Sequence, residues 1–182
     1  MQKVIYQNIG YDQLNVNLFD HFMRYQQVGN VWRKIAGKWV IEDHPFIDDW
    51  NKDDIVFLVK CLQDTITNNG LVYGAFVDCQ LKGFVSVDGQ LLDDKEKYID
   101  LTSLHVSKDM RGTGTGRHLF NYAKLWASQK GAHKLYISAH SAVESQAFYQ
   151  AMGCVEAKVC QSKHVDMEPF DCQLEYQLLD KD

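Results

Sequence analysis

The stretch LHVSKDMRGTGTG, residues 104–116, joins the end of an apolar strand to a turn that is rich in glycine. The glycines at positions 112, 114 and 116 remove the side chains that would block close approach of a ligand. The turn runs directly into a helical pattern over residues 114–130, so backbone N–H groups converge at a helix N-terminus. Such a terminus binds phosphate oxygens, and Arg111 adds a positive charge beside it. We therefore predict an anion-binding site here.

Three known glycine loops compete for this stretch. The dinucleotide fingerprint needs a third glycine where Arg117 stands, and the nucleotide P-loop needs lysine and a hydroxyl residue where Arg117 and His118 stand. A third pattern, R/Q-x-x-G-x-G/A, is matched at each defined position by residues 111–116, which are Arg111, Gly112, Thr113, Gly114, Thr115 and Gly116. A glycine-rich turn without a ligand is the alternative, and the strand before the turn and the helix after it weigh against that alternative.

A second stretch, SQAFYQAMGC at residues 145–154, resembles the helix-to-strand signature A-x-x-F-Y-x-x-x-G-F. Phe148, Tyr149 and Gly153 match it, whereas Ser145 replaces the usual alanine and Cys154 the usual aromatic residue. Together the two stretches resemble the GNAT superfamily of N-acetyltransferases. The resemblance is specific over a core of about residues 98–155, and before that core only the order of elements agrees.

The resemblance implies acetyl-CoA as cosubstrate and a place for it. In the family two central strands splay apart, and here they correspond to residues 98–106 and 134–139. Pantetheine would lie in the gap and pair with backbone groups of the first strand, while the pyrophosphate would lie on the glycine loop. The implied cofactor-binding residues are Leu104, His105, Val106, Ser145 and residues 111–116.

The resemblance also implies roles in proton transfer, because the attacking amine must lose a proton and the leaving thiolate must gain one. Tyr149 stands where the family carries its general acid, and a phenol with a reference pKa of about 10 is protonated at neutral pH. A tyrosine packed in the core is the alternative. Asp100 stands where some members carry a base, and strand alternation places it on one face with Leu104 and Val106. A solvated Asp100 that only orients substrate is one alternative, and His105, on the other face, is a second candidate base.

Apolar periodicity predicts the remaining elements and a single domain over residues 1–182. Helices are expected over residues 14–25, 53–66, 114–130 and 142–152. Strands are expected over residues 4–9, 71–77, 81–87, 98–106, 134–139, 155–160 and 172–178, with a further hairpin over residues 31–42 that His44-Pro45 terminates. The fold class is α/β or α+β, and the GNAT resemblance implies a mixed, mostly antiparallel sheet of about six to seven strands with about four helices.

In GNAT proteins the segment before the first hairpin of the core forms much of the acceptor site, and here that segment spans about residues 29–70. It contains three tryptophans and six carboxylates, a combination that suits a cationic amine. Core tryptophans and a solvated acidic surface are the alternative interpretation. The residues are Trp32, Trp39, Trp50, Glu42, Asp43, Asp48, Asp49, Asp53 and Asp54.

Composition excludes several function classes. The formal net charge is -5 and no basic run occurs, so a nucleic-acid partner has no electrostatic support. No apolar run is long enough for a membrane partner, and the five cysteines lack metal spacing. We expect free thiols, a cytoplasmic location and no metal. Homodimers are common in the family, but no segment here establishes one.

The predicted function is N-acetyl transfer from acetyl-CoA to a primary amine of a small molecule by direct attack. Two alternatives stay open from sequence: acetylation of a protein or peptide amine, and an acyl-CoA-binding module without turnover. The identity of the acceptor, the length of the acyl chain and the base that accepts the amine proton are not encoded in any pattern of the sequence.

Overall fold

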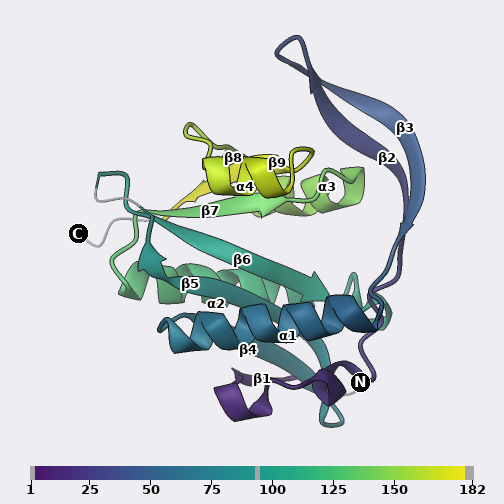
Figure 1. Ribbon diagram of the computed structural model, residues 1–182, viewed down its shortest axis with the longest axis vertical. Helices are drawn as coiled ribbons and strands as arrows, with labels where there is room; N and C mark the ends of the chain where they lie inside the picture. Colours follow the sequence, from purple (N-terminus) through teal and green to yellow (C-terminus); the bar gives the residue numbers. More distant parts are fainter. Residues whose placement is uncertain (1–2, 93–94, 179–182) are drawn as a thin grey trace.

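The computed structural model describes residues 3–92 and 95–178, and within these ranges the strands pair into a seven-stranded sheet in the order β1-β4-β5-β6-β7-β9-β8 (Figure 1). Neighbours are antiparallel except for β6 and β7, which run parallel. This confirms the predicted mixed, mostly antiparallel sheet. The strands are β1 (Ile5–Asn8), β4 (Leu71–Val77), β5 (Gln80–Leu91), β6 (Tyr98–Val106), β7 (Lys134–Ala139), β8 (Val155–Glu156) and β9 (Cys172–Gln177).

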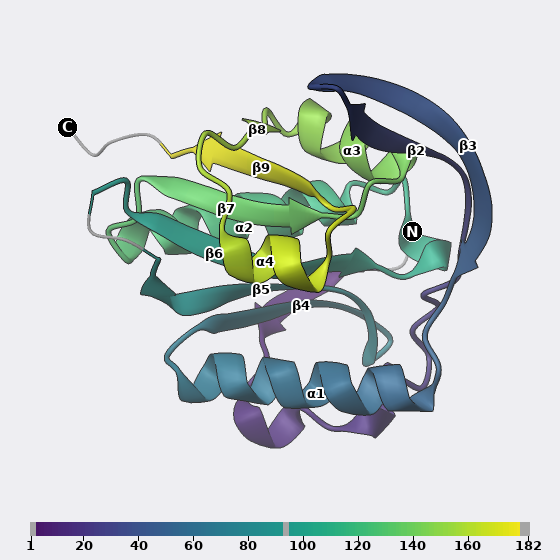
Figure 2. The same cartoon turned by 45° about the horizontal axis from the view of Figure 1, so that its top comes forward.

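Helices cover both faces of the sheet (Figure 2). On one face α1 buries Val59 and Leu62 against strand residues that include Phe84. On the other face α2 buries Leu119 and Phe120 in the larger of the hydrophobic clusters. The described residues contain four α-helices, in agreement with the predicted number: α1 (Lys52–Thr67), α2 (Thr115–Gln129), α3 (Val143–Ala151) and α4 (Ser162–Met167).

Two predictions of individual elements are wrong. Residues 14–25 form no α-helix, because the 3-10 turns Tyr11–Gln13 and Val16–Phe19 lead into extended chain. The side chain of Asn15 accepts a backbone N–H two residues ahead and starts a new turn, in competition with a continuous helix. The strand predicted over residues 155–160 is limited to the short β8, and α4 follows it.

The predicted hairpin over residues 31–42 is confirmed, and it is longer than expected. Its strands are β2 (Gln26–Ile35) and β3 (Lys38–Asp48). Ala36 and Gly37 form the turn with positive φ angles of 48° and 80°, the combination that matches the twist of a tight hairpin. Figure 1 shows the hairpin as a curved arm along one side of the sheet.

His44-Pro45 does not terminate this hairpin, as the sequence had suggested. The register passes from Val28 opposite Phe46 to Asn30 opposite Asp43, so Gly29 opposes both His44 and Pro45. A bulge of this kind accommodates a proline, which cannot donate to the ladder. The strand therefore continues through the proline.

Contacts with the connection between β7 and α3 hold the hairpin against the sheet. The backbone N–H of Trp32 donates to the carbonyl of Ser141 at 2.8 Å, and Arg33 Nη1 donates to the Ser141 hydroxyl at 2.6 Å. These bonds fix β2 beside the end of β7. The residues that precede and begin β2 consequently lie next to the gap described below.

The two central strands diverge as the family resemblance implies. β6 and β7 pair only where Tyr98–Asp100 meets Lys134–Tyr136, although both strands continue further. Beyond Asp100 the edge of β6 that faces β7 has no strand partner among the described residues. The sheet therefore opens between these strands toward their C-terminal ends.

Candidate functional site

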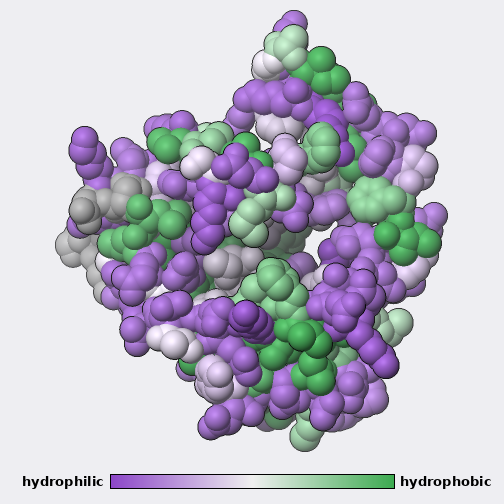
Figure 3. All heavy atoms as spheres, in the orientation of Figure 1, coloured by the Kyte–Doolittle hydropathy of each residue, from purple (hydrophilic) through white to green (hydrophobic). Residues whose placement is uncertain are grey.

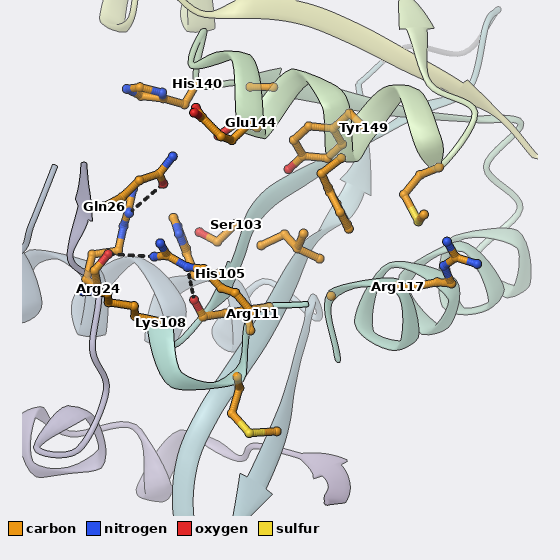
Figure 4. A pocket seen from close by; sticks show the side chains of 18 of the residues that line it. Arg24, Gln26, Ser103, His105, Lys108, Arg111, Arg117, His140, Glu144 and Tyr149 are labelled. Atoms are coloured by element: carbon orange, nitrogen blue, oxygen red, sulfur yellow. Dashed lines mark hydrogen bonds between the residues drawn. The ribbon is translucent and has the colours of Figure 1, made fainter. Parts of the chain in front are cut away.

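A cavity of about 850 Å³ occupies this opening. Figure 3 shows a gap on this face of the molecule, to the right of the centre, with many hydrophilic side chains around it. Five parts of the chain form the wall: the residues around the start of β2, the second half of β6, the loop before α2 with the first turn of α2, the end of β7, and α3. Residues from these parts include Arg24, Gln26, Ser103, His105, Lys108, Arg111, Arg117, His140, Glu144 and Tyr149 (Figure 4).

Most of the predicted site residues lie in this wall. Asp100, Thr113 and Thr115 do not, although they were predicted to belong to the site. The predicted residues that line the cavity are Leu104, His105, Val106, Arg111, Gly112, Gly114, Gly116, Ser145 and Tyr149.

The glycine loop has the conformation that only glycine adopts without strain. Gly112 and Gly114 have φ angles of +77° and +89°, and a Cβ atom on either would meet nothing within 4 Å. The space is therefore open, and the backbone alone demands glycine at these positions. At Gly116 a Cβ atom would lie 3.2 Å from the ring of Phe148, so this glycine lets α2 approach α3 closely.

The backbone N–H groups of residues 112–116 donate to no described residue. They stand immediately before and at the first turn of α2, where the helix leaves its N–H groups unsatisfied. Thr113 holds the loop in shape, because its hydroxyl donates to the carbonyl of Met110 at 2.7 Å and lies 2.9 Å from the Thr115 hydroxyl. The two threonines thus support the loop from outside the cavity, and the loop presents unpaired N–H donors that fit an anionic group.

Arg111 lines the cavity, and it also makes two hydrogen bonds to backbone carbonyls. Its Nε donates to the carbonyl of Val106 at 3.2 Å, and its Nη2 donates to the carbonyl of Arg24 at 2.9 Å. Burial, followed by the neighbouring Arg24, lowers the pKa of Arg111 from its ordinary value. The guanidinium therefore ties the chain before β2 to the end of β6 through two of its N–H donors.

Tyr149 lies on α3 with its ring packed edge-on to Phe120, and the side chain is buried. Its hydroxyl has no hydrogen-bond partner among the described residues and points into the cavity (Figure 4). Burial, and to a smaller extent Cys154 and Asp171, raises the pKa of Tyr149 above the ordinary value of 10.0. The phenol therefore stays protonated at neutral pH and can donate a proton.

The predicted face of Asp100 is wrong because β6 contains a bulge. Ser86 pairs with Ser103 and Val87 pairs with Leu101, so Thr102 is an extra residue in β6 and reverses the alternation after it. Leu104 consequently packs with Leu101 against the α2 cluster, while Asp100 lies on the opposite face.

Asp100 is buried there beneath α4. His164 Nε2 donates to Asp100 Oδ2 at 2.6 Å, and Oδ1 has no partner among the described residues. The hydrogen bond to Asp100 is the largest of the effects that raise the pKa of His164, and burial opposes it. Asp100 therefore belongs to a buried pair with His164, outside the cavity wall.

His105 lies on the same face as Asp100, beside Trp50 and Phe84 at centroid distances of 4.9 Å and 5.4 Å. Burial lowers the pKa of His105 to about 3, and the nearby Arg24, Arg111 and His140 contribute in the same direction. The imidazole is therefore neutral over the physiological range, and it adds no charge to the cavity.

These features agree with the comparison to known families. The model of the acetyltransferase (GNAT) domain matches residues 47–174, which is more than half of the chain. The chain belongs to the GNAT acetyltransferase family. This makes it an acyltransferase by family, and the matched range includes the splayed strands and the glycine loop.

Solved structures of other acetyltransferases share the fold at low sequence identity. Nourseothricin acetyltransferase matches with a TM-score of 0.70, 14% identity and coverage of 97% of this chain and 99% of the other. The PaiA N-acetyltransferase of Thermoplasma acidophilum, in complex with coenzyme A, has a TM-score of 0.60, 14% identity and coverage of 96% and 99%. The ribosomal-protein-S18-alanine N-acetyltransferase of Escherichia coli has a TM-score of 0.62, 12% identity and coverage of 99% and 97%. A search of curated protein sequences finds no match.

In this GNAT chain the segment predicted to form the acceptor site does not line the cavity. No described residue between positions 29 and 70 lines the cavity. Trp50 packs in the core against Phe22 and Phe84, and Asp54 is part of the N-terminal capping of α1 with Asn51. Trp50 and Asp54 therefore serve packing and capping, which was the alternative interpretation of the sequence.

The cavity wall also contains residues that the sequence did not single out. Residues 24–27 line the cavity from the chain that leads into β2, and His140 and Glu144 line it from the end of β7 and the start of α3. No local pattern marks these positions, because long-range contacts of the hairpin bring them to the gap.

Three further observations concern membrane crossing, metal binding and the cysteines. Within the described ranges no helix combines the length and the apolar character that crossing a bilayer requires. The described histidine, cysteine, aspartate and glutamate side chains form no group of three or more that could hold a metal ion. The five cysteines carry free thiols, as predicted.

Proposed function

We propose that this chain transfers the acetyl group of acetyl-CoA to a primary amine of a small molecule. One observation supports this more than any other. The glycine loop, whose N–H groups are unpaired among the described residues, opens onto the same cavity as the hydroxyl of Tyr149. An anion-binding loop and a protonated phenol that border one space suit a phosphate-bearing thioester.

The residues of the cavity wall fit coenzyme A by chemistry. The N–H groups of residues 112–116 would hold its pyrophosphate, since they are unsatisfied within the described chain and a helix N-terminus favours negative charge. The backbone of Leu104 and Val106 would pair with pantetheine, because the edge of β6 that faces β7 lacks a strand partner beyond Asp100 within the described ranges. Ser145 borders the same space from α3.

Acetyl-CoA supplies an activated carbonyl carbon with a thiolate as leaving group. The amine attacks this carbon directly, and Tyr149 delivers a proton to the leaving sulfur. Its raised pKa keeps the proton on the phenol at working pH. Asp100 has no part in the proposed contact with the amine, because its carboxylate lies outside the cavity wall and is bonded to His164.

Thermal stability in the presence of ligands tests this proposal. We expect acetyl-CoA and coenzyme A to raise the melting temperature, and ATP and NAD to raise it much less. At a ligand concentration one hundred times the dissociation constant, the gain corresponds to about 2.7 kcal/mol. The variant Gly114→Glu should lose the gain, because a carboxylate would occupy the phosphate position.

Gly131→Glu is the matched control. Gly131 also has a positive φ, +82°, and open space around a Cβ atom, but it lies outside the cavity wall. Both variants carry the same backbone strain, so a loss of binding in Gly114→Glu alone identifies the loop as the site. Equal gains with ATP or NAD, or equal losses in both variants, would contradict a coenzyme A site.

A further inference from the structure

Glu144 is the carboxylate that lines the cavity. It stands in the first turn of α3, next to Ser145 and on the same helix as Tyr149. Figure 4 shows its side chain on the α3 side of the cavity, with Gln26 and Ser103 on the opposite side. The Glu144 side chain has no hydrogen bond or ion pair with any described residue, and it is exposed to solvent from the cavity mouth. It is therefore a negative charge without a partner of its own.

The other carboxylates near the cavity are already paired. Asp48 forms an ion pair with Arg24, and Asp109 accepts hydrogen bonds from Lys82 and Ser107. None of these carboxylates belongs to the cavity wall, and in the described chain Glu144 is the acidic side chain that does.

The cationic side chains of the wall on the side of β2 and β6 also have interaction partners. Arg111 donates to backbone carbonyls, Arg24 pairs with Asp48, and Lys108 Nζ lies 4.4 Å from the ring centroid of Tyr25. Arg117 lies on α2, on the far side of the cavity from Glu144 in Figure 4, near the glycine loop. The unpaired charge beyond the Tyr149 hydroxyl is thus negative, and the neutral His105 does not offset it.

We infer that Glu144 binds the ammonium group of the acceptor and accepts its proton, so that the acceptor is a primary amine that is cationic at neutral pH. This inference rests on the proposed acetyl transfer. A carboxylate attracts such an amine through a charge-assisted hydrogen bond.

The nitrogen loses two protons over the reaction. Glu144 accepts the first from the ammonium and releases it to solvent. The lone pair that is freed forms the C–N bond while the C–S bond breaks and its electron pair passes to sulfur. Tyr149 gives its proton to that sulfur and regains one, through solvent, from the acylated nitrogen. One proton is released in total, and the enzyme returns to its starting state.

The test compares three variants with the wild type: Glu144→Gln, Glu144→Asp and the control Glu42→Gln. Glu42 is an exposed carboxylate on β3, outside the cavity wall, so its change removes the same charge elsewhere. Rates are measured from release of free thiol with spermidine, tyramine and lysine as acceptors at saturating acetyl-CoA. Acetyl-CoA binding is measured separately by calorimetry.

We expect Glu144→Gln to lower kcat/KM for these amines by about tenfold or more, through both KM and kcat, and to leave the dissociation constant of acetyl-CoA within about twofold. Glu144→Asp should recover most of the loss, and Glu42→Gln should match the wild type. A structural role at the start of α3 would instead change the melting temperature of both Glu144 variants and would alter acetyl-CoA binding as well.

Failure of the proposed role of Glu144 and failure of the proposed function give different results. An active wild type with Glu144→Gln within about twofold of it, or with Glu144→Asp as weak as Glu144→Gln, overturns the role of Glu144 alone. A wild type that binds acetyl-CoA and acetylates none of the three amines contradicts the proposed function, and the role of Glu144 with it.

Discussion

The proposed coenzyme side and the proposed acceptor side of the cavity are built in different ways. The coenzyme side comes from one continuous part of the chain, because β6, the glycine loop, α2, β7 and α3 follow one another within residues 98–151. The acceptor side combines residues 24–27 with His140 and Glu144, which are more than one hundred positions apart. Motifs of fixed spacing describe the first side, and tertiary contacts of the hairpin create the second.

This difference explains which kind of ligand each side is suited to bind. A phosphate needs a particular backbone path, and Gly112 and Gly114 supply it locally through positive φ angles. Recognition of an acceptor needs side chains at particular points in space, and distant segments supply them. Arg111 joins the two sides, since it belongs to the glycine motif but holds the chain before β2.

The largest effect is expected on the coenzyme side, at Tyr149. Tyr149→Phe should lower kcat by about 10²- to 10⁴-fold, the usual contribution of a general acid, and leave the dissociation constant of acetyl-CoA unchanged. The folded state should keep its stability, because the hydroxyl has no partner among the described residues. Steady-state kinetics with calorimetric binding of acetyl-CoA check both expectations.

The pH dependence sharpens this prediction. The protonated phenol is the active form, and the pKa of Tyr149 is raised above 10.0. The rate should therefore show no decline from tyrosine ionisation up to pH 10. A Tyr149→Phe variant with kcat within about threefold of the wild type would remove the general acid from the mechanism.

Much of the fold could be predicted from the sequence because its signals are local. The helix that begins at Lys52, the strands on both sides of residues 78–79 and the region from β6 to α3 follow periodicity and turn residues. α4 could not be predicted, since its six residues, Ser162–Met167, carry no apolar stripe. The bulge at Thr102 could not be predicted either, because it depends on the register with β5.

The bulge leads to the second prediction, which concerns Asp100. Asp100→Asn should lower the free energy of unfolding by about 1–3 kcal/mol near pH 6, since it weakens a charge-assisted hydrogen bond to His164. The raised pKa of His164 means that this stabilisation is present below its ordinary value of 6.5 and is lost as the pH rises through the folded value. Urea unfolding from pH 5.5 to pH 9 should show the decline in the wild type and a flatter profile in the variant.

The same variant can overturn the assignment of Asp100 to the buried pair. Acetyl transfer should stay within about threefold of the wild type, because the carboxylate is outside the cavity wall. A loss of about 10²-fold in kcat with unchanged stability would instead make Asp100 the base that its strand position first suggested.

The third prediction concerns Arg111 and tests whether binding of the amine and binding of acetyl-CoA depend on different residues. Arg111→Met should raise KM for the amine by about three- to tenfold, because it removes two hydrogen bonds that hold the chain before β2. The dissociation constant of acetyl-CoA should change by less than about twofold. Arg117→Met, near the glycine loop, should give the opposite pattern. A tenfold weaker binding of acetyl-CoA in Arg111→Met would mean that this guanidinium contacts phosphate after all.

The candidate site could be predicted only as far as its motifs extend. Gly112, Gly114 and Tyr149 line the cavity where the two stretches suggested. The sequence did not indicate a functional role for Glu144. A glutamate in the first turn of a helix is common, because it interacts favourably with the helix dipole. The acidic and aromatic residues of positions 29–70 do not line the cavity, and Trp50 and Asp54 show that core packing and capping need the same residue types as cation recognition.

The smallest effect is therefore expected from two exposed carboxylates of that segment. Neutralising Glu42 and Asp43 together, as Gln and Asn, should leave KM for cationic amines within about twofold, although it removes two negative charges. Both side chains are exposed on β3 outside the cavity wall, and charges that water and salt surround act weakly over distance. Kinetics at low and at physiological ionic strength check this: a larger KM that salt abolishes would reveal long-range steering by the hairpin. A larger KM at both ionic strengths would place the hairpin itself in contact with the acceptor, and the acceptor side would then extend beyond the wall that Glu144, Gln26 and His140 define.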